Sequence, residues 1–336
     1  MISAKFQNEA IEKAFLNFQS EWKKNDSIEV FTSGSTGEPK NILFPKEKMI
    51  LSANKTINFF NLRNSINALI CLSLETIAGK MMLVRAFVGK WNLNIVEPTA
   101  NPLNNIDEKI DFVALVPVQL ERILLESPEK LRKINTIIVG GAPVSNFLIN
   151  LLKENEMTVF QTFGMTETVS HIAIRKIGMQ TDNFYETVDG VKVSALNGNL
   201  MIHYPEMFEE PLQTKDQVNI ISPTKFVWIG RTDFMINSGG VKLNPEKIEQ
   251  KLVEIIPFPF FIFGLNDENL GQKLALVIEN NSNYTPEKER LKGILDKYET
   301  PKVFITVKEI VRTKSGKMNR IKTIEKINED DWKTIV

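Results

Sequence analysis

The strongest constraint on the fold is an alternation of apolar runs and helix-spaced stretches that extends from Ile28 to about Phe163. Short apolar runs predict buried strands, and the amphipathic stretches between them predict helices. The predicted strands are residues 28–31, 68–74, 112–116 and 134–139, and the predicted helices are residues 80–88 and 117–125. This order favours an α/β fold in which helices cover a parallel sheet.

The pattern changes after Gly190 to short strands at residues 191–193, 200–203 and 226–229, with a hairpin turn at Asn197-Gly198. After Thr232 the pattern predicts an α+β module. It has a helix capped by Asn244 with Pro245 first, strands at 260–263, 274–278 and 303–307, and a helix at 287–298. The sequence therefore predicts a large domain of residues 1–232 and a small domain of residues 233–336.

A loop rich in glycine and hydroxyl groups follows the first predicted strand, from Thr32 to Lys40. Glycine lets the backbone approach an anion closely, and N–H groups together with Ser and Thr hydroxyls can bind a phosphate. The spacing differs from that of the P-loop, in which a lysine directly follows the second glycine. Alone, this segment predicts either a phosphate-binding loop or an ordinary turn.

Three further segments carry residues suited to a metal–nucleotide site. Thr166 and Glu167 follow a strand end, where a hydroxyl can bind a phosphate and a carboxylate can hold Mg²⁺. Asp216 and Arg231 can bind ribose hydroxyls, and a basic segment occupies residues 312–320. Each segment alone has a plainer interpretation: a helix start, a pair of surface charges or a solvated loop.

In this order and at these intervals, the four segments resemble the acyl-adenylate-forming superfamily of acyl-CoA synthetases, peptide-synthetase adenylation domains and luciferases. The resemblance runs from Phe31 to Arg320. It implies an adenylate-forming enzyme fold, with a large N-terminal domain that combines a parallel sheet, helices and a β-rich part, and a small α+β C-terminal domain. Because only about thirty residues precede the loop, we expect a truncated N-terminal subdomain, which a homodimer partner could complete.

The resemblance also implies roles for the matching positions. ATP phosphates are expected at Thr32, Ser33, Gly34, Ser35, Thr36, Gly37 and Lys40, adenine at Gly140, Gly141, Ala142, Pro143 and Phe163, and ribose at Asp216 and Arg231. The implied catalytic residues are Lys317, Thr166 and Glu167, the last as Mg²⁺ ligand; Asp233 is the implied hinge, and Gly239 and Gly240 face CoA. One departure is Lys215, which stands where the family commonly has glycine.

These roles describe an AMP-forming acid–thiol ligase that uses ATP, Mg²⁺ and CoA. A carboxylate attacks the α-phosphate of ATP, so two anions meet, and the charges of Lys317 and of Mg²⁺ on Glu167 offset their repulsion. A thiol, usually that of CoA, then attacks the acyl-adenylate. The family implies that the small domain rotates about its hinge between the two steps.

Other departures narrow the choice of acid. Thr76 stands where most members have His, Lys80 follows the next glycine, and Ser170-His171 is a polar pair in an apolar run. Together with residues 97–103, these features look like the o-succinylbenzoate–CoA ligases of menaquinone synthesis, especially short forms from Bacteroidetes-like bacteria. That substrate has a ring and two carboxylates, so the carboxylate that is not activated needs a cation or several donors. The candidates are Thr76, Lys80, Arg85, Ser170 and His171.

Two other hypotheses stay open. One keeps the chemistry but changes the acid or the acceptor: another aryl or short acyl-acid CoA ligase, or an enzyme that loads a carrier protein. The other is a non-catalytic nucleotide-binding protein. The absence of a carrier segment after Arg320 argues against carrier loading, and the presence of Lys317 argues against a mere binding scaffold.

Composition restricts partners and compartment. Lys plus Arg and Asp plus Glu both number 41, so charge favours neither nucleic acid nor a membrane surface as partner. The single cysteine, Cys71, lies in an apolar run and cannot form an internal disulfide, which predicts a buried thiol in a reducing compartment. With no apolar stretch of membrane-spanning length and no signal-peptide pattern, we predict a cytoplasmic protein that binds small molecules.

Overall fold

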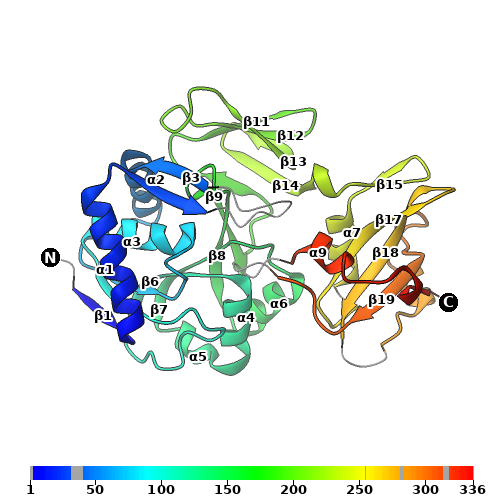
Figure 1. Cartoon of the computed structure of the whole chain (residues 1–336), viewed down its shortest axis with the longest axis horizontal. Coiled ribbons are helices and arrows are strands. Elements are labelled where there is room, and N and C mark those ends of the chain that lie inside the picture. The colour runs from blue at the N-terminus through cyan, green and yellow to red at the C-terminus, as the bar shows by residue number, and fades with distance from the viewer. Residues whose placement is uncertain (1–2, 32–40, 254, 281–283, 313–317, 336) are drawn as a thin grey trace.

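The computed structural model describes residues 3–31, 41–253, 255–280, 284–312 and 318–335. A large mixed sheet occupies the N-terminal part of the chain (Figure 1). Its parallel half consists, in spatial order, of β1 (Ala4–Phe6), β5 (Asn92–Ile95), β4 (Asn67–Ile70), β6 (Ile110–Leu115), β7 (Ile134–Val139) and β8 (Thr158–Gly164). The predicted parallel sheet is therefore confirmed.

The sheet continues with antiparallel strands. They are, in spatial order, β9 (His171–Gly178), β10 (Tyr185–Thr187), β14 (Lys225–Arg231), β13 (Leu212–Ser222), β12 (Asn199–His203) and β11 (Lys192–Leu196). Asn197 and Gly198 join β11 to β12 with φ values of 53° and 80°, as expected for the predicted hairpin turn. The β-rich character predicted after Gly190 is confirmed.

Helices cover both faces of the parallel half. Successive strand residues point to opposite faces, so the apolar residues of a strand must be buried on both sides. In β4, Ala68 and Ile70 pack into one core cluster and Leu69 packs into the other. The first cluster includes side chains of α1 (Glu9–Lys24), α2 (Lys46–Phe59) and α3 (Ile77–Gly89). The second includes side chains of α4 (Pro117–Glu126), α5 (Pro128–Leu131) and α6 (Asn146–Glu154).

The first predicted strand has a different partner from the one its position suggests. It forms β2 (Ser27–Phe31), which pairs with β3 (Asn41–Pro45) in a separate antiparallel hairpin. Ile28 and Val30 are buried and Glu29 between them is exposed. This alternation suits a hairpin with one buried face rather than a central parallel strand.

Residues after Arg231 form a second sheet with its own core. Its strands are β15 (Ile236–Ser238), β16 (Val241–Leu243), β17 (Phe260–Asp267), β18 (Gly271–Glu279), β19 (Val303–Val307) and β20 (Lys333–Thr334). The helices are α7 (Pro245–Leu252), α8 (Lys288–Lys292) and α9 (Arg320–Ile324), with 3₁₀ turns η1 (Thr232–Phe234) and η2 (Glu329–Asp331). Its core clusters contain residues from Ile236 onward. The domain division at residues 232 and 233 stays a prediction.

Local signals explain which element boundaries were predicted well. The helix at Pro245 begins as expected, because Asn244 Oδ1 accepts hydrogen bonds from the N–H groups of Glu246 and Lys247 at 2.9 and 3.1 Å. The helix predicted at residues 287–298 is wrong: α8 ends at Lys292, before Gly293, and turns follow. β4 ends at Ile70, short of the predicted 68–74, while α3 begins earlier than predicted, at Ile77.

The predicted burial of the cysteine is confirmed. Cys71 is fully buried, and burial raises the pKa of its thiol to about 12. Across the described parts of the chain, every helix is too short or too polar to cross a membrane.

Candidate active site

The candidate residues of the large sheet gather where its parallel strands end. Gly140 to Pro143 follow β7, and the turn containing Thr166 and Glu167 follows β8. Ligands of open α/β sheets bind beyond the carboxyl ends of the strands. The predicted loop residues Thr32, Ser33, Gly34, Ser35, Thr36, Gly37 and Lys40, and the predicted catalytic Lys317, lie outside the described residues.

The turn after β7 depends on its glycines. Gly141 has a φ of +84°, in the left-handed region that favours glycine. A Cβ on Gly140 would lie 2.2 Å from Thr162 Oγ1 of β8, so a larger residue here would displace the Thr162 side chain. Next to Thr162, Phe163 packs against Tyr185 and Phe226 with ring centroids 5.6 and 5.2 Å apart.

Arg85, Thr56, Ser170 and His171 form a polar group inside the protein, here called the Arg85 cluster. Arg85 Nε donates to Thr56 Oγ1 at 3.2 Å, and Nη2 donates to Ser170 Oγ at 2.6 Å. His171 Nε2 lies 3.1 Å from Thr56 Oγ1, and Nδ1 lies 3.4 Å from Ser170 Oγ. Only 2% of Arg85 is exposed, and no described carboxylate pairs with it. The cluster therefore contains a buried cation without a counter-ion among the described residues.

Burial changes the protonation of this cluster. It lowers the pKa of Arg85 to about 10, which leaves the guanidinium charged at neutral pH. Burial, together with the positive charge of Arg85, holds the pKa of His171 well below its ordinary value. His171 is therefore a neutral imidazole at pH 7, able to donate one hydrogen bond and accept another.

The other two candidates for acid recognition lie apart from the Arg85 cluster. Thr76 is the N-cap of α3: its Oγ1 accepts from the Gly79 N–H at 3.3 Å and donates to Ser73 O at 2.8 Å. Lys80 Nζ donates to the backbone oxygen of Glu29 at 2.6 Å and lies over the ring of Phe18. Both side chains have local structural partners, so the structure separates them from Arg85, Ser170 and His171.

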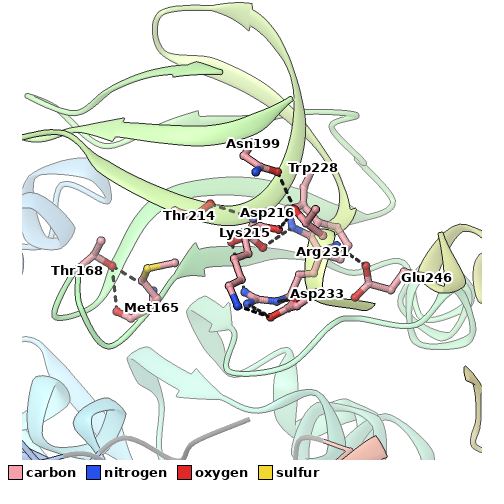
Figure 2. A network of polar contacts seen from close by, with 11 residues as sticks. Met165, Thr168, Asn199, Thr214, Lys215, Asp216, Trp228, Arg231, Asp233 and Glu246 are labelled. Atoms are coloured by element: carbon pink, nitrogen blue, oxygen red, sulfur yellow. Dashed lines mark hydrogen bonds and ion pairs between the residues drawn. The ribbon is translucent and has the colours of Figure 1, made fainter. Parts of the chain in front are cut away.

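The predicted ribose residues lie opposite each other, Asp216 within β13 and Arg231 at the end of β14. Together with Lys215, Trp228 and Asp233 they form a group called the β13–β14 cluster (Figure 2). Asp216 is buried and accepts from Trp228 Nε1 at 2.9 Å. Arg231 Nη1 lies 3.6 Å from Asp216 Oδ2. Arg231 also donates from Nε and Nη2 to the two oxygens of Asp233, at 3.0 and 2.9 Å.

Charges in the β13–β14 cluster are balanced. Lys215 Nζ lies 3.8 Å from Asp233 Oδ2, so two cations face two carboxylates. Burial alone would raise the pKa of Asp233, but the hydrogen bonds and charge of Arg231 hold it below its ordinary value. Glu246 extends the group from α7, because its Oε2 accepts from the Arg231 N–H at 2.8 Å. Burial raises the pKa of Glu246 to about 7.

The two glycines expected to face CoA form the turn between β15 and β16. Gly239 and Gly240 have φ values of 59° and 81°, which glycine adopts without steric cost. Both are in the second sheet, beyond Asp233. The conformation explains why glycine is needed, and the CoA-facing role stays a prediction.

Comparison with known proteins identifies the family. A profile of the AMP-binding enzymes matches residues 4–198, more than half of the chain. This chain belongs to the AMP-binding enzyme family. It is 35% identical to an AMP-forming acyl-CoA synthetase/AMP-acid ligase II-like protein from Dyadobacter fermentans, over 96% of both chains and with a TM-score of 0.64.

Other AMP-binding enzymes resemble the chain at lower identity. The 2-succinylbenzoate–CoA ligase of Listeria monocytogenes is 24% identical over 88% of this chain and 69% of the relative. The o-succinylbenzoate–CoA synthetase of Bacillus subtilis, solved with ATP and magnesium, has a TM-score of 0.74 at 19% identity, over 96% of this chain and 79% of that one. The predicted adenylate-forming fold and the predicted class, an AMP-forming acyl-CoA ligase, are confirmed. The predicted use of ATP, Mg²⁺ and CoA agrees with these relatives.

The residues of this AMP-binding enzyme fit a magnesium ion that is held mainly by water and phosphate. Among the described residues, there is no group of three or more His, Cys, Asp and Glu side chains that could enclose a metal. Glu167 is exposed in the turn after β8, and the structure gives it no ion pair with a described residue. Mg²⁺ commonly takes one or two protein carboxylates and completes its shell with water and nucleotide phosphates. Glu167 can supply such a carboxylate.

Sequence reasoning missed three residues of these clusters: Thr56, Trp228 and Glu246. Thr56 follows Met49 and Ala53 at helical spacing on the buried stripe of α2, so a hydroxyl on an apolar stripe was its available signal. No comparable signal marks Trp228 or Glu246, which reach the site through pairing of β13 with β14 and packing of α7 beside β14.

One motif lies elsewhere than expected. Residues 97–103, associated with acid recognition in the sequence, contribute Glu97 and Thr99 to Pro102 to a surface cavity of about 550 Å³. Its other lining residues come from β1, β5, the following loop and α4, and none belongs to the Arg85 cluster. This segment therefore does not contribute to that cluster.

Proposed function

We propose that this enzyme is a 2-succinylbenzoate–CoA ligase. In its first reaction, a substrate carboxylate oxygen bonds to the α-phosphorus of ATP, and the bond to pyrophosphate breaks. In its second reaction, the CoA sulfur bonds to the acyl carbon, and AMP leaves as the thiol loses its proton. Two anions meet in the first step, so most of the required catalysis is electrostatic.

The observation that carries the choice of acid is the charge of Arg85, which no described carboxylate pairs with. A buried cation is costly unless an anion compensates it. The side chains around it are two hydroxyls and a neutral imidazole, which can bind a carboxylate without repelling it. An acid with a second carboxylate supplies the missing anion. The Listeria relative acts on such an acid, 2-succinylbenzoate.

The remaining roles follow the family pattern. Asp216 and Arg231 bind the ribose, Thr166 binds phosphate, and Gly140, Gly141, Ala142, Pro143 and Phe163 border the adenine. Glu167 would hold Mg²⁺, which supplies positive charge beside the phosphates when bound. Lys317 and the loop of residues 32–40 supply further positive charge and N–H donors to the reacting phosphate.

Residues 233–336 form the proposed mobile domain, which rotates about Asp233 between the two reactions and brings Gly239 and Gly240 towards CoA. Support comes from the separate cores on the two sides of η1 and from the short backbone link at Asp233, as is common for hinges. A homodimer and a cytoplasmic location belong to the same proposal.

The first test replaces Arg85 by Met, which keeps the length of the side chain and removes its charge. A buried carboxylate that loses its partner costs about 3–5 kcal/mol, so KM for 2-succinylbenzoate should rise by roughly two to four orders of magnitude while KM for ATP changes little. The measurement is acid-dependent pyrophosphate release, with benzoate, succinate and 2-succinylbenzoate compared. Wild-type enzyme should prefer 2-succinylbenzoate, and Arg85→Met should lose much of that preference.

Lys80→Met is the matched control, because it removes a cation from the same helix, five residues away. Lys80 contacts Glu29 and Phe18 rather than the Arg85 cluster, so its loss should change KM for the acid only a few-fold. If Lys80→Met raised that KM more than Arg85→Met, the assignment of the carboxylate would be wrong. If the wild type preferred a monocarboxylic acid, the alternative of another acyl-acid CoA ligase would replace the proposal.

A further inference from the structure

The turn between β8 and β9 contains a buried valine with unusual backbone geometry. Val169 has a φ of +65°, a region in which a β-branched residue is a genuine outlier. The residue lies between two functional groups in sequence: Thr166 and Glu167 precede it, and Ser170 and His171 follow it. Strained residues of this kind persist only where their surroundings enforce them, and they concentrate at functional sites.

Hydrogen bonds define the turn type. The Ser170 N–H donates to Thr168 O at 2.7 Å, and the Val169 N–H donates to Thr166 O at 2.8 Å. A bond between residues two apart, around a residue with positive φ, is the rare and strained form of the γ-turn. Thr168 closes the turn with its side chain: its Oγ1 accepts from the Met165 N–H at 3.1 Å (Figure 2). The same oxygen lies 2.7 Å from Ser170 O.

Two features hold the strained turn in position. The Val169 side chain is fully buried in the core cluster that also contains Ile172 and Ala173. At the base of the turn, a Cβ on Gly164 would lie 2.4 Å from Ser170 O and 2.5 Å from His171 Cα. The backbone of Ser170 and His171 is therefore pressed against β8, and the packed valine keeps the chain there.

We propose that Val169 is a positioning residue that fixes Ser170 and His171 against Arg85 while Glu167, two residues earlier, stays exposed to the nucleotide. The γ-turn keeps a fixed distance between the carboxylate of Glu167, the proposed Mg²⁺ ligand, and the Arg85 cluster, the proposed site for the acid. The strained turn holds Ser170, His171 and Glu167 in one arrangement, and the strain lowers the stability of the fold. The roles given to Glu167 on one side of the turn and to Ser170 and His171 on the other rest on the proposed function, whereas the strain at Val169 does not.

The experiment compares Val169→Gly with Val169→Ala. Both remove the packed side chain, but only glycine adopts positive φ without steric cost. Val169→Gly should therefore have the higher midpoint of thermal unfolding of the two. It should also be the less active, because the turn is then free to move: kcat/KM for the acid should fall about 100-fold, with KM for ATP within about three-fold of wild type. Val169→Thr keeps the branched shape and should retain KM for the acid within a few-fold.

Val193 provides the matched control, since it is buried in the same core cluster but lies in β11 without positive φ. There the order should reverse, with Val193→Ala more stable than Val193→Gly. An equal or lower midpoint for Val169→Gly than for Val169→Ala would overturn the strain. Wild-type kcat/KM for the acid in Val169→Gly would overturn the positioning role. If Val169→Gly and Val169→Ala failed to fold, Val169→Leu would replace them, because it keeps an apolar side chain without the branch at Cβ. A large loss of acid kcat/KM in Val169→Leu with an unchanged KM for ATP would then support the role, and wild-type kcat/KM would overturn it.

These results are distinguishable from a failure of the proposed function. The unfolding midpoints need no substrate, and the kinetic comparison can use whichever acid the wild type activates best. If that acid is not 2-succinylbenzoate, the choice of substrate fails. The role of the turn is then still tested by two comparisons. One is the order of the unfolding midpoints of Val169→Gly and Val169→Ala, and the other is the change in KM for the acid relative to the change in KM for ATP.

Discussion

The Arg85 cluster and the β13–β14 cluster differ in how their positive charges are compensated. In the β13–β14 cluster, Arg231 and Lys215 face the carboxylates of Asp216 and Asp233, and both cations are partly exposed. In the Arg85 cluster, a cation with 2% exposure donates to the hydroxyls of Thr56 and Ser170. The first group has balanced charges without a ligand. Within the described parts of the chain, the second has no anion, and this difference indicates where a charged substrate contributes most to binding.

The largest expected effect is on KM, and it should fall on a different substrate for each cluster. Asp216→Asn keeps the shape of the side chain and an acceptor for Trp228, but removes the charge that binds ribose hydroxyls in the proposed site. KM for ATP should rise about 100-fold, because charge-assisted hydrogen bonds are about twice as strong as neutral ones, whereas KM for the acid should change little. Arg85→Met should show the reverse pattern. Initial-rate measurements in both substrates check this, and equal effects on both KM values would remove the distinction between the clusters.

A smaller effect concerns the ligand-free protein. Because Arg85 is buried and no described residue supplies a counter-ion, Arg85→Met should stabilise the fold by about 2 kcal/mol, as replacement of buried ionic groups by apolar ones often does. Asp216→Asn removes one member of a balanced group and should destabilise the fold. Denaturant unfolding without substrates measures both. A loss of stability in Arg85→Met would mean that the cation serves the fold rather than the substrate.

The smallest effect tests the edge of the β13–β14 cluster through pH. The pKa of Glu246 is about 7 in the folded protein and near 4.5 when unfolded, so the folded state binds more protons between these values. Stability from this group is therefore present below pH 4.5 and is lost as pH rises through 7. Glu246→Gln can still accept from the Arg231 N–H, and it should be more stable than wild type at pH 8, where the wild-type carboxyl is charged.

The comparison of Glu246→Gln with wild type needs thermal unfolding at several pH values from 4.5 to 8. The charges of Arg320, Glu249 and Asp216 act on this carboxyl, and that of Glu249 raises its pKa. Glu249→Gln is therefore a useful second variant, because it removes one of these charges. The gain in Glu246→Gln should disappear towards pH 4.5, where the wild-type carboxyl is also neutral. Parallel pH curves for the two proteins would show that Glu246 titrates normally.

The sequence alone determined the family, the class of chemistry and most elements. Signals that act over a few residues were sufficient: the cap by Asn244 before Pro245, the turn at Asn197-Gly198, and the apolar run that became β19. Four segments, among them those with Thr166-Glu167, Asp216 and Arg231, resemble those of adenylate-forming enzymes, and the family match agrees with this resemblance. Such patterns are local or motif-like, so they can be recognised without coordinates.

Only the tertiary structure decided between Lys80 and Arg85. Five helical residues correspond to a rotation of about 140°, so the two cations leave α3 in different directions, and α3 is too apolar to reveal which direction is inward. Arg85 meets Thr56 and Ser170, which are 29 and 85 residues away in sequence. The strain at Val169 likewise depends on Gly164 and on core packing. Contacts at such separations arise from the packing of whole elements, which local sequence preferences do not encode.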